Sequence, residues 1–364
     1  MRGMKELVPN KDEGFTEILK LVAPGTELRE GLENILKSKT GGLIVVGDSK
    51  EVLDIVDGGF FVNVEYSPAK LYELAKMDGA IVLSSDFKRI LYANAQLIPL
   101  STIETKETGT RHRTAERTAK QTGNLVISIS QRRSIITLYK ENIKYVLEET
   151  RSILEKANQA LQTVEKYKKV FDSKINMLNE YEFNDIVTLD NVLTVLQRAE
   201  MTMRMAEEVQ KRIFELGEEG RLVKIQLDEL IGGLEKEEQL VIKDYVVSNK
   251  RKKVEQIFSK IVELNYEELM KENVIANILG YGDFDNYDEV AVYPRGYRIL
   301  NKIPRMPVNI VENLIQSFKT FQHIIAADIK DLDEVEGIGE VRAKNIKQSI
   351  KRMQEQFVFD NVII

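Results

Sequence analysis

"AIVLSSDFKRILYANAQL", residues Ala80–Leu97, holds two apolar stretches with a short polar turn between them. The turn is Ser84-Ser85-Asp86, and such residues favour turns because their side chains hydrogen-bond the local backbone. An apolar stretch on each side of a tight turn is typical of a β-hairpin. The stretch therefore predicts two paired strands and places a sheet in the N-terminal part of the chain.

Further strands and a helix surround this hairpin. Pro68 follows Ser67, which predicts a helix that begins with proline after a serine cap. A tight turn is expected at Gln131–Arg133, between two strands that pair with each other. The remaining predicted strands are "LIVVGD" (43–48), "FFVNVEY" (60–66), "NLVISISQ" (124–131) and "SIITLY" (134–139). The chain up to about Lys140 therefore predicts a mixed sheet flanked by helices.

From about Glu141 to Leu279 the apolar spacing changes to that of helices. Leu, Glu, Lys, Gln and Met dominate this region, which contains no proline, and all five are good helix formers. The positions that carry the helical spacing include Val146, Ile153, Leu154, Leu161, Val164 and Val170. The pattern predicts a central helical bundle or spine. We interpret Met201, Met203 and Met205 as adaptable core rather than as a binding surface.

The C-terminal region contains an internal repeat. "IPRMPVNIVENLIQSFK" from Ile303 aligns without a gap with "VEGIGEVRAKNIKQSIK" from Val335. Such a repeat indicates a duplicated supersecondary unit. The chain is therefore expected to be a multidomain protein with α/β and all-α parts, divided into domains at residues 1–140, 141–292 and 293–364.

The second copy of the repeat has two glycines just before a helix. Glycines spaced in this way let backbone N–H groups approach an anion closely. The pattern resembles the helix-hairpin-helix motif, which grips DNA phosphates, and tandem copies resemble the paired form in DNA repair and junction-binding proteins. The first copy departs from it, because Arg305 and Pro307 replace the glycines. The expected DNA-binding residues are Gly337, Ile338, Gly339, Arg342, Lys344 and Lys347.

The alternative for this repeat is a solvated helical hairpin with a glycine turn. Residues 294–352 carry eleven Lys or Arg and seven Asp or Glu, whereas the whole chain has a net charge of −6. The local excess of positive charge favours binding to DNA that is dominated by phosphate contacts and sensitive to salt.

"TGTRHRTAER" (108–117) concentrates groups that bind phosphate. Arg111 and Arg113 offer planar, bidentate donors suited to phosphate oxygens, and His112 adds a third donor. The segment that follows is helical in pattern, so the arginines lie at or just before a helix N-terminus, which attracts anions. The alternative is an exposed basic turn with two glutamates as partners, Glu107 and Glu116.

Two earlier segments complete the N-terminal pattern. In "KMDGA" (76–80), Asp78 lies at a helix-to-strand turn, where a carboxylate beside a triphosphate is placed to hold a divalent ion. The alternative is an ordinary helix C-terminal turn closed by Gly79. "GGLIVVGD" (41–48) lacks the spacing of the dinucleotide fingerprint and of the P-loop. We interpret it as a buried strand, or more specifically as one whose end lies near a nucleobase.

The order of these segments, with DGA followed about thirty residues later by RHR, resembles the diadenylate cyclase family. The resemblance extends over nearly the whole chain, through the long helical region to the tandem helix-hairpin-helix units. It implies a diadenylate cyclase fold and the condensation of two ATP molecules into cyclic di-AMP, with release of two pyrophosphates. It also implies an octamer whose cyclase domains meet face to face, and suppression of synthesis by branched DNA.

The resemblance also assigns roles to individual residues. Asp78 becomes the carboxylate linked to Mg²⁺ or Mn²⁺ that helps to activate the attacking 3′-hydroxyl. Gly79 allows close approach to the nucleotide, and Leu97 lies against the adenine. The residues that cradle the triphosphate are Thr110, Arg111, His112, Arg113 and Thr114, with Ser130 as a further phosphate contact. It stays open whether His112 contacts phosphate or only holds the two arginines apart.

Composition excludes several classes of function. The chain has 364 residues and no cysteine, which excludes disulfides, thiolate catalysis and cysteine-ligated zinc. It has no apolar stretch long enough to cross a bilayer and no signal-peptide core at its start, so we expect no membrane span and a cytoplasmic location. Two other functions stay open: a DNA-binding scaffold with a silent nucleotide-binding domain, and a different nucleotidyltransferase or ATP hydrolase.

Overall fold

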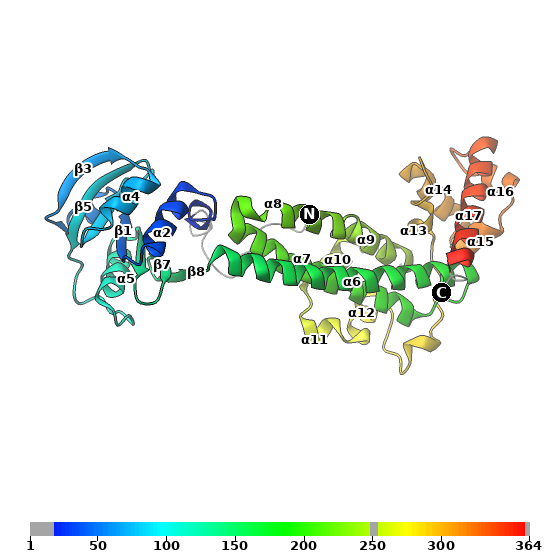
Figure 1. Cartoon of the computed structure of the whole chain (residues 1–364). Helices are drawn as coiled ribbons and strands as arrows, with labels where there is room; N and C mark the ends of the chain where they lie inside the picture. The colour runs from blue at the N-terminus through cyan, green and yellow to red at the C-terminus, as the bar shows by residue number, and fades with distance from the viewer. Residues whose placement is uncertain (1–17, 248–253, 361–364) are drawn as a thin grey trace. The chain divides into compact units, whose positions relative to one another are not determined.

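The computed structural model describes residues 18–247 and 254–360 (Figure 1). Contacts divide the chain into two compact units. The first combines the chain up to Gln159 with Val209–Lys224, and the second combines Ala160–Glu208 with the chain from Ile225 onward. In the two described ranges, no helix is both long enough and apolar enough to cross a membrane.

A mixed sheet forms the centre of the first unit. Its elements are α2 (Glu27–Lys37), β1 (Gly42–Val46), α3 (Lys50–Leu53), β2 (Val56–Asp57), β3 (Phe60–Glu65), α4 (Pro68–Leu74), β4 (Ala80–Leu83), β5 (Arg89–Leu97), α5 (Thr110–Thr122), β6 (Leu125–Ser130), β7 (Ile135–Lys140) and β8 (Ile143–Leu147). The strand order is β2-β5-β4-β1-β6-β7-β8, and β3 also pairs with β5. β1 and β4 run parallel, whereas β4–β5 and β6–β7 are antiparallel, which confirms both predicted strand pairs.

Alternation along the strands builds a core on each face of this sheet. In β1, Ile44 packs into a cluster with residues of α2 and α4, whereas Val45 packs into a cluster with residues of α5. Successive strand side chains point to opposite faces, so one strand serves both clusters. α5 contributes Ala115 and Ala119, both fully buried, and these small side chains let the helix lie close to the sheet.

Local signals set the ends of two helices that flank the sheet. Ser67 Oγ accepts a hydrogen bond from the backbone N–H of Lys70, and Pro68 is the first residue of α4, as predicted. α5 ends at Gly123, whose φ of 69° lies in the left-handed region that favours glycine. The start and the end of these helices follow from residues close by in the sequence.

The helical prediction is wrong at its N-terminal end. Residues 143–147 form β8, which pairs antiparallel with β7, and helix α6 begins at Thr150. β8 lies at the edge of the sheet and its side chains are half-buried or exposed. It therefore lacks the continuous apolar run that marks a buried strand, and Val146 fitted a helical spacing by chance.

Helices make up the second unit, as the spacing predicted. Three helices are shared by both units: α6 (Thr150–Asn184), α7 (Leu189–Leu216) and α8 (Arg221–Ile231). The second unit continues with α9 (Leu234–Tyr245), α10 (Val254–Glu263), α11 (Tyr266–Leu269) and α12 (Glu272–Leu279). Met203 is buried in the core that these helices form, and Met201 packs against it. The interpretation as core is confirmed for Met201 and Met203, and for Met205, which is half-buried, it stays a prediction.

The C-terminal repeat has the same local structure in both copies. Its helices are α13 (Tyr297–Leu300), α14 (Val308–Phe318), α15 (Phe321–Ala326), α16 (Ile329–Asp333) and α17 (Glu340–Asp360). The alignment of the two copies superposes the first residue of α13 on that of α16, and the first residue of α14 on that of α17. The turns match as well: Met306 N–H donates to Ile303 O at 3.3 Å, and Ile338 N–H donates to Val335 O at 3.0 Å.

The first turn keeps this shape without glycine. Arg305 has a φ of 59° where Gly337 has a φ of 82°, so an arginine occupies the left-handed region that glycine occupies in the second copy. A left-handed conformation costs a residue with a side chain on the order of 1–2 kcal/mol. Burial of Ile303 and Ile310 on either side of the turn offsets that cost, since both are about 5% exposed or less.

Candidate functional site

Two predicted site residues, Asp78 and Ser130, lie at the same end of the sheet as Gly41. β1 and β4 pair in parallel from Ile44 beside Ile81 onward, so Gly41 and Asp78 precede the two strands at the same end of the sheet. β1 and β6 pair antiparallel with Gly42 beside Ile129, so Ser130, the last residue of β6, lies at that end as well. Asp78 and Ser130 therefore lie at one end of the sheet, although they are far apart in the sequence.

Gly79 and Leu97 lie at the same end of the sheet. Ala80 pairs with Ala95, which leaves Gly79 just before the paired region and Leu97 just after it. Gly79 has a φ of 100°, and a Cβ there would lie 2.8 Å from the carbonyl oxygen of Ala95. This position therefore requires glycine. Leu97 is 7% exposed and packs in the core cluster beside α5, so its predicted contact with adenine stays a prediction.

α5 begins at Thr110, so the RHR sequence forms its first turn. Consecutive helical residues are rotated by roughly 100°, which sends His112 to the inner side and the arginines to its two flanks. A Cβ at Gly41 would lie 2.7 Å from Cζ of Arg111, so this guanidinium lies over the start of β1. Arg113 is exposed and instead lines a pocket of about 460 Å³ beside residues 101–107.

The N-terminus of α5 is open to an anion. Its N-cap is Gly109, which makes no side-chain capping hydrogen bond. The first N–H groups of a helix lack partners within the helix, and their dipoles attract negative charge. Thr110 is exposed and Thr114 is half-buried on the outer side of this first turn. The turn therefore combines backbone donors, two hydroxyls and the guanidinium of Arg111 at the end of the sheet that carries Asp78.

His112 points away from this outer surface. It is 8% exposed, and its Nδ1 lies 3.0 Å from Oη of Tyr139 on β7. Tyr139 in turn donates its hydroxyl hydrogen to Glu107 at 3.0 Å, and Glu107 forms an ion pair with Lys144 on β8. Nε2 of His112 is buried and has no hydrogen-bond partner among the residues that the structure describes.

The charges around this network set its protonation. Burial lowers the pKa of His112, and Arg133, Lys144 and Arg111 lower it further, against the opposing effect of Glu107. Burial alone would raise the pKa of Glu107, but hydrogen bonds from Lys144 and Tyr139 outweigh it and hold that pKa below its ordinary value. At neutral pH, His112 is therefore uncharged and Glu107 is ionised.

Sequence reasoning missed three residues of this site. Gly41 was assigned only to the start of a buried strand, Glu107 was considered only as a partner of a basic turn, and Tyr139 was assigned only to a strand. The glycine pair before an apolar strand was a usable signal for close approach to Gly41. The contacts of Glu107 and Tyr139 depend on which strand lies beneath α5, and no local pattern specifies that.

Asp78 is the residue predicted to hold a divalent ion at this end of the sheet. Its side chain is exposed, and residues 18–247 and 254–360 contain no cluster of three or more His, Cys, Asp or Glu placed to hold a metal. Mg²⁺ keeps several waters and is commonly held by one or two carboxylates together with substrate phosphates. An exposed carboxylate fits that mode of binding, in which the substrate supplies further ligands.

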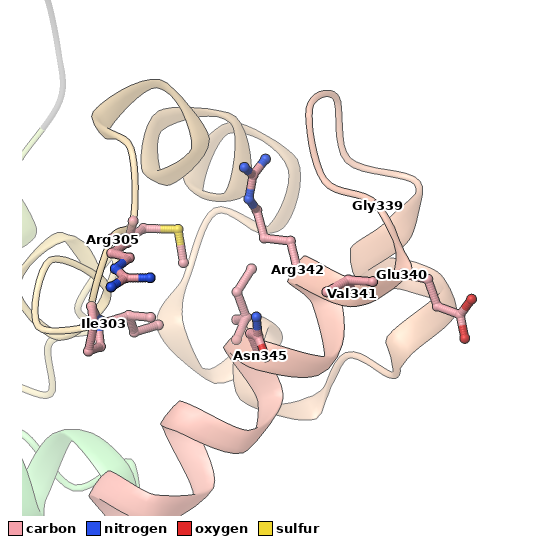
Figure 2. A pocket seen from close by; sticks show the side chains of 10 residues that line it. Ile303, Arg305, Gly339, Glu340, Val341, Arg342 and Asn345 are labelled. Carbon is pink, nitrogen blue, oxygen red and sulfur yellow. The ribbon is translucent and has the colours of Figure 1, made fainter.

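In the C-terminal repeat, a pocket of about 570 Å³ lies between the two turns (Figure 2). Arg305 from the first copy and Arg342 from the second both line it, and Figure 2 shows Glu340 turned away from them. Arg342 donates to the carbonyl of Gly337, which holds this side chain at the glycine turn. The two arginines come from equivalent hairpins and create a positive surface that neither copy has alone.

The predicted DNA-binding lysines have different surroundings. Lys344 is exposed and forms an ion pair with Glu340 at 2.6 Å. Lys347 is partly buried and donates to the backbone carbonyls of Ile325 and Ala327 at the end of α15. Its ammonium therefore satisfies a helix C-terminus, where cations are favoured. Its predicted role at DNA is untested, but these contacts give it a structural role.

Two protein-family models match successive segments of the chain. A family model described as DisA bacterial checkpoint controller nucleotide-binding matches residues 29–143. A second, described as the DisA bacterial checkpoint controller linker region, matches residues 147–287. The first match contains strands β1 to β7 and helix α5, and the second covers most of the helical region.

Similar proteins match over almost their full length. The chain is 54% identical to the DNA integrity scanning protein DisA of Acetivibrio thermocellus, over 98% of this chain and 99% of that protein. It is 55% identical to the protein of the same name in Clostridium botulinum strain Loch Maree, over 97% and 99% respectively. The chain is also similar to the solved structure of DacA from Staphylococcus aureus, with 19% sequence identity. The match covers 38% of this chain and 91% of the DacA chain. Its TM-score of 0.30 is too low to indicate a shared fold.

Proposed function

Because the chain belongs to the DisA family of bacterial checkpoint controllers, we propose that its first unit is a diadenylate cyclase. It would join two ATP molecules into cyclic di-AMP and release two pyrophosphates. One observation carries the proposal: Asp78 and Ser130 lie at the end of the sheet where β1 begins, and the guanidinium of Arg111 lies over Gly41 at that same end. A carboxylate, a guanidinium and an open helix N-terminus in one place are the groups that phosphoryl transfer requires.

The reaction is two equivalent substitutions at phosphorus. In each, the 3′-oxygen of one ATP bonds to the α-phosphorus of the other, the bond to pyrophosphate breaks, and the hydroxyl proton leaves to a base. We assign Asp78 to the attacking hydroxyl, which it would help to deprotonate. Mg²⁺ or Mn²⁺ held by Asp78 and the phosphates would supply charge neutralisation.

The first turn of α5 is proposed to hold the triphosphate. Arg111 can reach the phosphates from above β1, and Thr110 and Thr114 offer hydroxyls on the same outer side. Positive charge fixed here stabilises the leaving pyrophosphate more than the bound ATP, because charge develops on the leaving group. Arg113 lines the separate pocket beside residues 101–107, on the other flank of the helix. We assign it a second contact with the triphosphate from that side.

A twofold product requires two such sites facing each other. One copy of the chain holds one carboxylate and one clamp, which is half of what the reaction needs. We therefore propose that two cyclase units meet face to face in a homo-oligomer, with the octamer of the family as the expected assembly. Activity should then depend on protein concentration when the chain is diluted below the dissociation constant of the oligomer.

The C-terminal repeat is proposed to be a tandem helix-hairpin-helix unit that binds DNA phosphates. The two matching turns and the pair Arg305 and Arg342 support this proposal. We further propose that occupancy by branched DNA lowers synthesis, through the helices that join the two ends of the chain. If a four-way junction left the rate of the purified protein unchanged, this coupling would be wrong.

The test is incubation of the full chain with ATP and Mg²⁺ or Mn²⁺, followed by mass spectrometry of the products. Cyclic di-AMP is expected from the wild type and should be lost in Asp78→Asn and in Arg111→Ala. Asp48→Asn is the matched control, because Asp48 follows the opposite end of β1 and accepts a hydrogen bond from Ser85 there. No product with either metal would favour a scaffold with a silent domain, and a linear product would favour another nucleotidyltransferase.

A further inference from the structure

The network beneath the first turn of α5 has a defined direction of hydrogen bonding. Glu107 is held ionised by Lys144, so its carboxylate can only accept hydrogen bonds. Tyr139 has one hydroxyl hydrogen, and this hydrogen is donated to Glu107 at 3.0 Å. The Tyr139 oxygen can then only accept from His112, so the ring hydrogen lies on Nδ1.

The protonation of Nδ1 fixes the state of the other ring nitrogen. In a neutral imidazole with its hydrogen on Nδ1, Nε2 carries a lone pair and cannot donate a hydrogen bond. Nε2 is also buried, and no described residue contacts it by a hydrogen bond. Cδ2, the ring carbon next to Nε2, faces Gly109, where a Cβ would lie 3.9 Å away. His112 therefore lies beneath the helix N-terminus and presents no donor to a phosphate.

We propose that Glu107 and Tyr139 are positioning residues for the proposed cyclase reaction, and that they act through His112 by fixing the orientation and the tautomer of its ring beneath the first turn of α5. His112 then holds the turn that carries Arg111 against the sheet and does not bind phosphate. The expected effect on the rate rests on the proposed function. The direction of the hydrogen bonds does not depend on the proposed function.

The arrangement explains why an uncharged ring belongs at this position. Five charged or polar groups face His112: Glu107, Tyr139, Arg111, Arg133 and Lys144. A protonated imidazole would add a third positive charge to the first turn of α5 and would repel both neighbouring arginines. An uncharged ring lets the guanidiniums stay in place for the substrate.

The direct test is the protonation of the ring. The chain has two histidines, so protein labelled with ¹⁵N in histidine rings gives two sets of signals in magic-angle-spinning NMR, which has no size limit. His323 is an internal reference, because its Nδ1 lies 2.9 Å from the carbonyl of Phe318. At pH 7.5 we expect His112 to be uncharged with hydrogen on Nδ1. A doubly protonated ring, or hydrogen on Nε2, would overturn the proposal.

Tyr139→Phe tests the direction of the network. It removes the oxygen that accepts from Nδ1 of His112, so the ring hydrogen is no longer fixed on Nδ1. The signals of His112 should then change while those of His323 stay unchanged. An unchanged His112 spectrum in Tyr139→Phe would show that Tyr139 does not control the ring.

Kinetics test the positioning role. Tyr139→Phe and Glu107→Ala should each lower kcat/KM for ATP about tenfold, because each removes a hydrogen bond from the network. Tyr66→Phe is the control, because it removes a hydroxyl that donates to Glu27 O in the same unit away from α5. Melting curves establish that the variants fold. Full activity in both network variants would overturn the positioning role. An inactive wild type would overturn the proposed function, and the NMR spectrum of His112 would then test the hydrogen-bond direction alone.

Discussion

The guanidinium of Arg111 lies over Gly41, in the space that any larger residue at position 41 would fill. Gly41 immediately precedes β1, and Arg111 stands in the first turn of α5, so the contact joins the two segments whose ends form the candidate site. The first prediction follows from it. Gly41→Ala should displace Arg111 and lower cyclic di-AMP synthesis at least tenfold, because the displaced atoms are the end of a flexible side chain that carries the binding charge.

Stability should change little in the same variant, since Arg111 can move without moving the backbone. Melting curves and the synthesis assay together measure the two effects. Gly282→Ala is the control, because no described atom lies within 4 Å of a Cβ at that position and its backbone is not left-handed. A Gly41→Ala protein with full activity would show that the position of Arg111 is not important for the reaction.

The second prediction concerns acid. Burial lowers the pKa of His112 in the folded chain below its ordinary value of 6.5, so the unfolded chain binds more protons between the two values. The free energy of unfolding should therefore fall as pH drops through 6.5 towards the lowered pKa, and it should be independent of this group above that window. Urea unfolding at pH 7.5 and pH 5.5 measures the change. His112→Gln should unfold with a smaller difference between the two conditions, and an equal difference would contradict the prediction.

The third prediction separates two residues of the C-terminal repeat. Arg342→Ala should weaken DNA binding and reduce the slope of log K against log salt by about one, as loss of one phosphate contact does. Lys347→Met should instead lower the melting temperature, because it removes the donor to the carbonyls of Ile325 and Ala327. Titration of a labelled four-way junction at several salt concentrations, with melting curves, distinguishes the two. If Lys347→Met reduced the salt slope while the melting temperature stayed the same, Lys347 would be a DNA contact.

The fourth prediction concerns the ion pair between Arg298 and Glu182, whose side chains are almost fully buried. Arg298 also donates to Asn179, so the pair joins α13 of the repeat to α6. Arg298→Met should cost about 3–5 kcal/mol, because it leaves Glu182 buried without its cation. Urea unfolding measures the loss.

Removing both charges should recover part of this stability. The double variant Arg298→Met, Glu182→Leu no longer buries the carboxylate of Glu182 without its cation, and apolar replacements of buried ion pairs are often tolerated. A double variant less stable than Arg298→Met alone would show that Glu182 contributes through other contacts, such as its hydrogen bond from Tyr245 at 2.6 Å.

Local sequence patterns determined a large part of this protein. The Ala80–Leu97 hairpin, the proline-led start of α4 and the end of α5 at Gly123 each depend on residues a few positions apart. The C-terminal repeat was equally visible, and the structure shows its helices and turns in register. Turns, caps and helical spacing act over one or two turns of chain, so the sequence specifies them directly.

The tertiary structure decided which of these segments meet. Strand pairing placed Gly41, Asp78 and Ser130 at one end of the sheet. The packing of α5 on the sheet turned His112 inward to Tyr139, while Arg111 and Arg113 point to different flanks of the helix. Packing also put Lys347 on a helix end, and added β8 to the sheet as an edge strand with little apolar signal. Such contacts join residues far apart in sequence. They depend on pairing, on burial and on the direction of each side chain, and no short pattern contains that information.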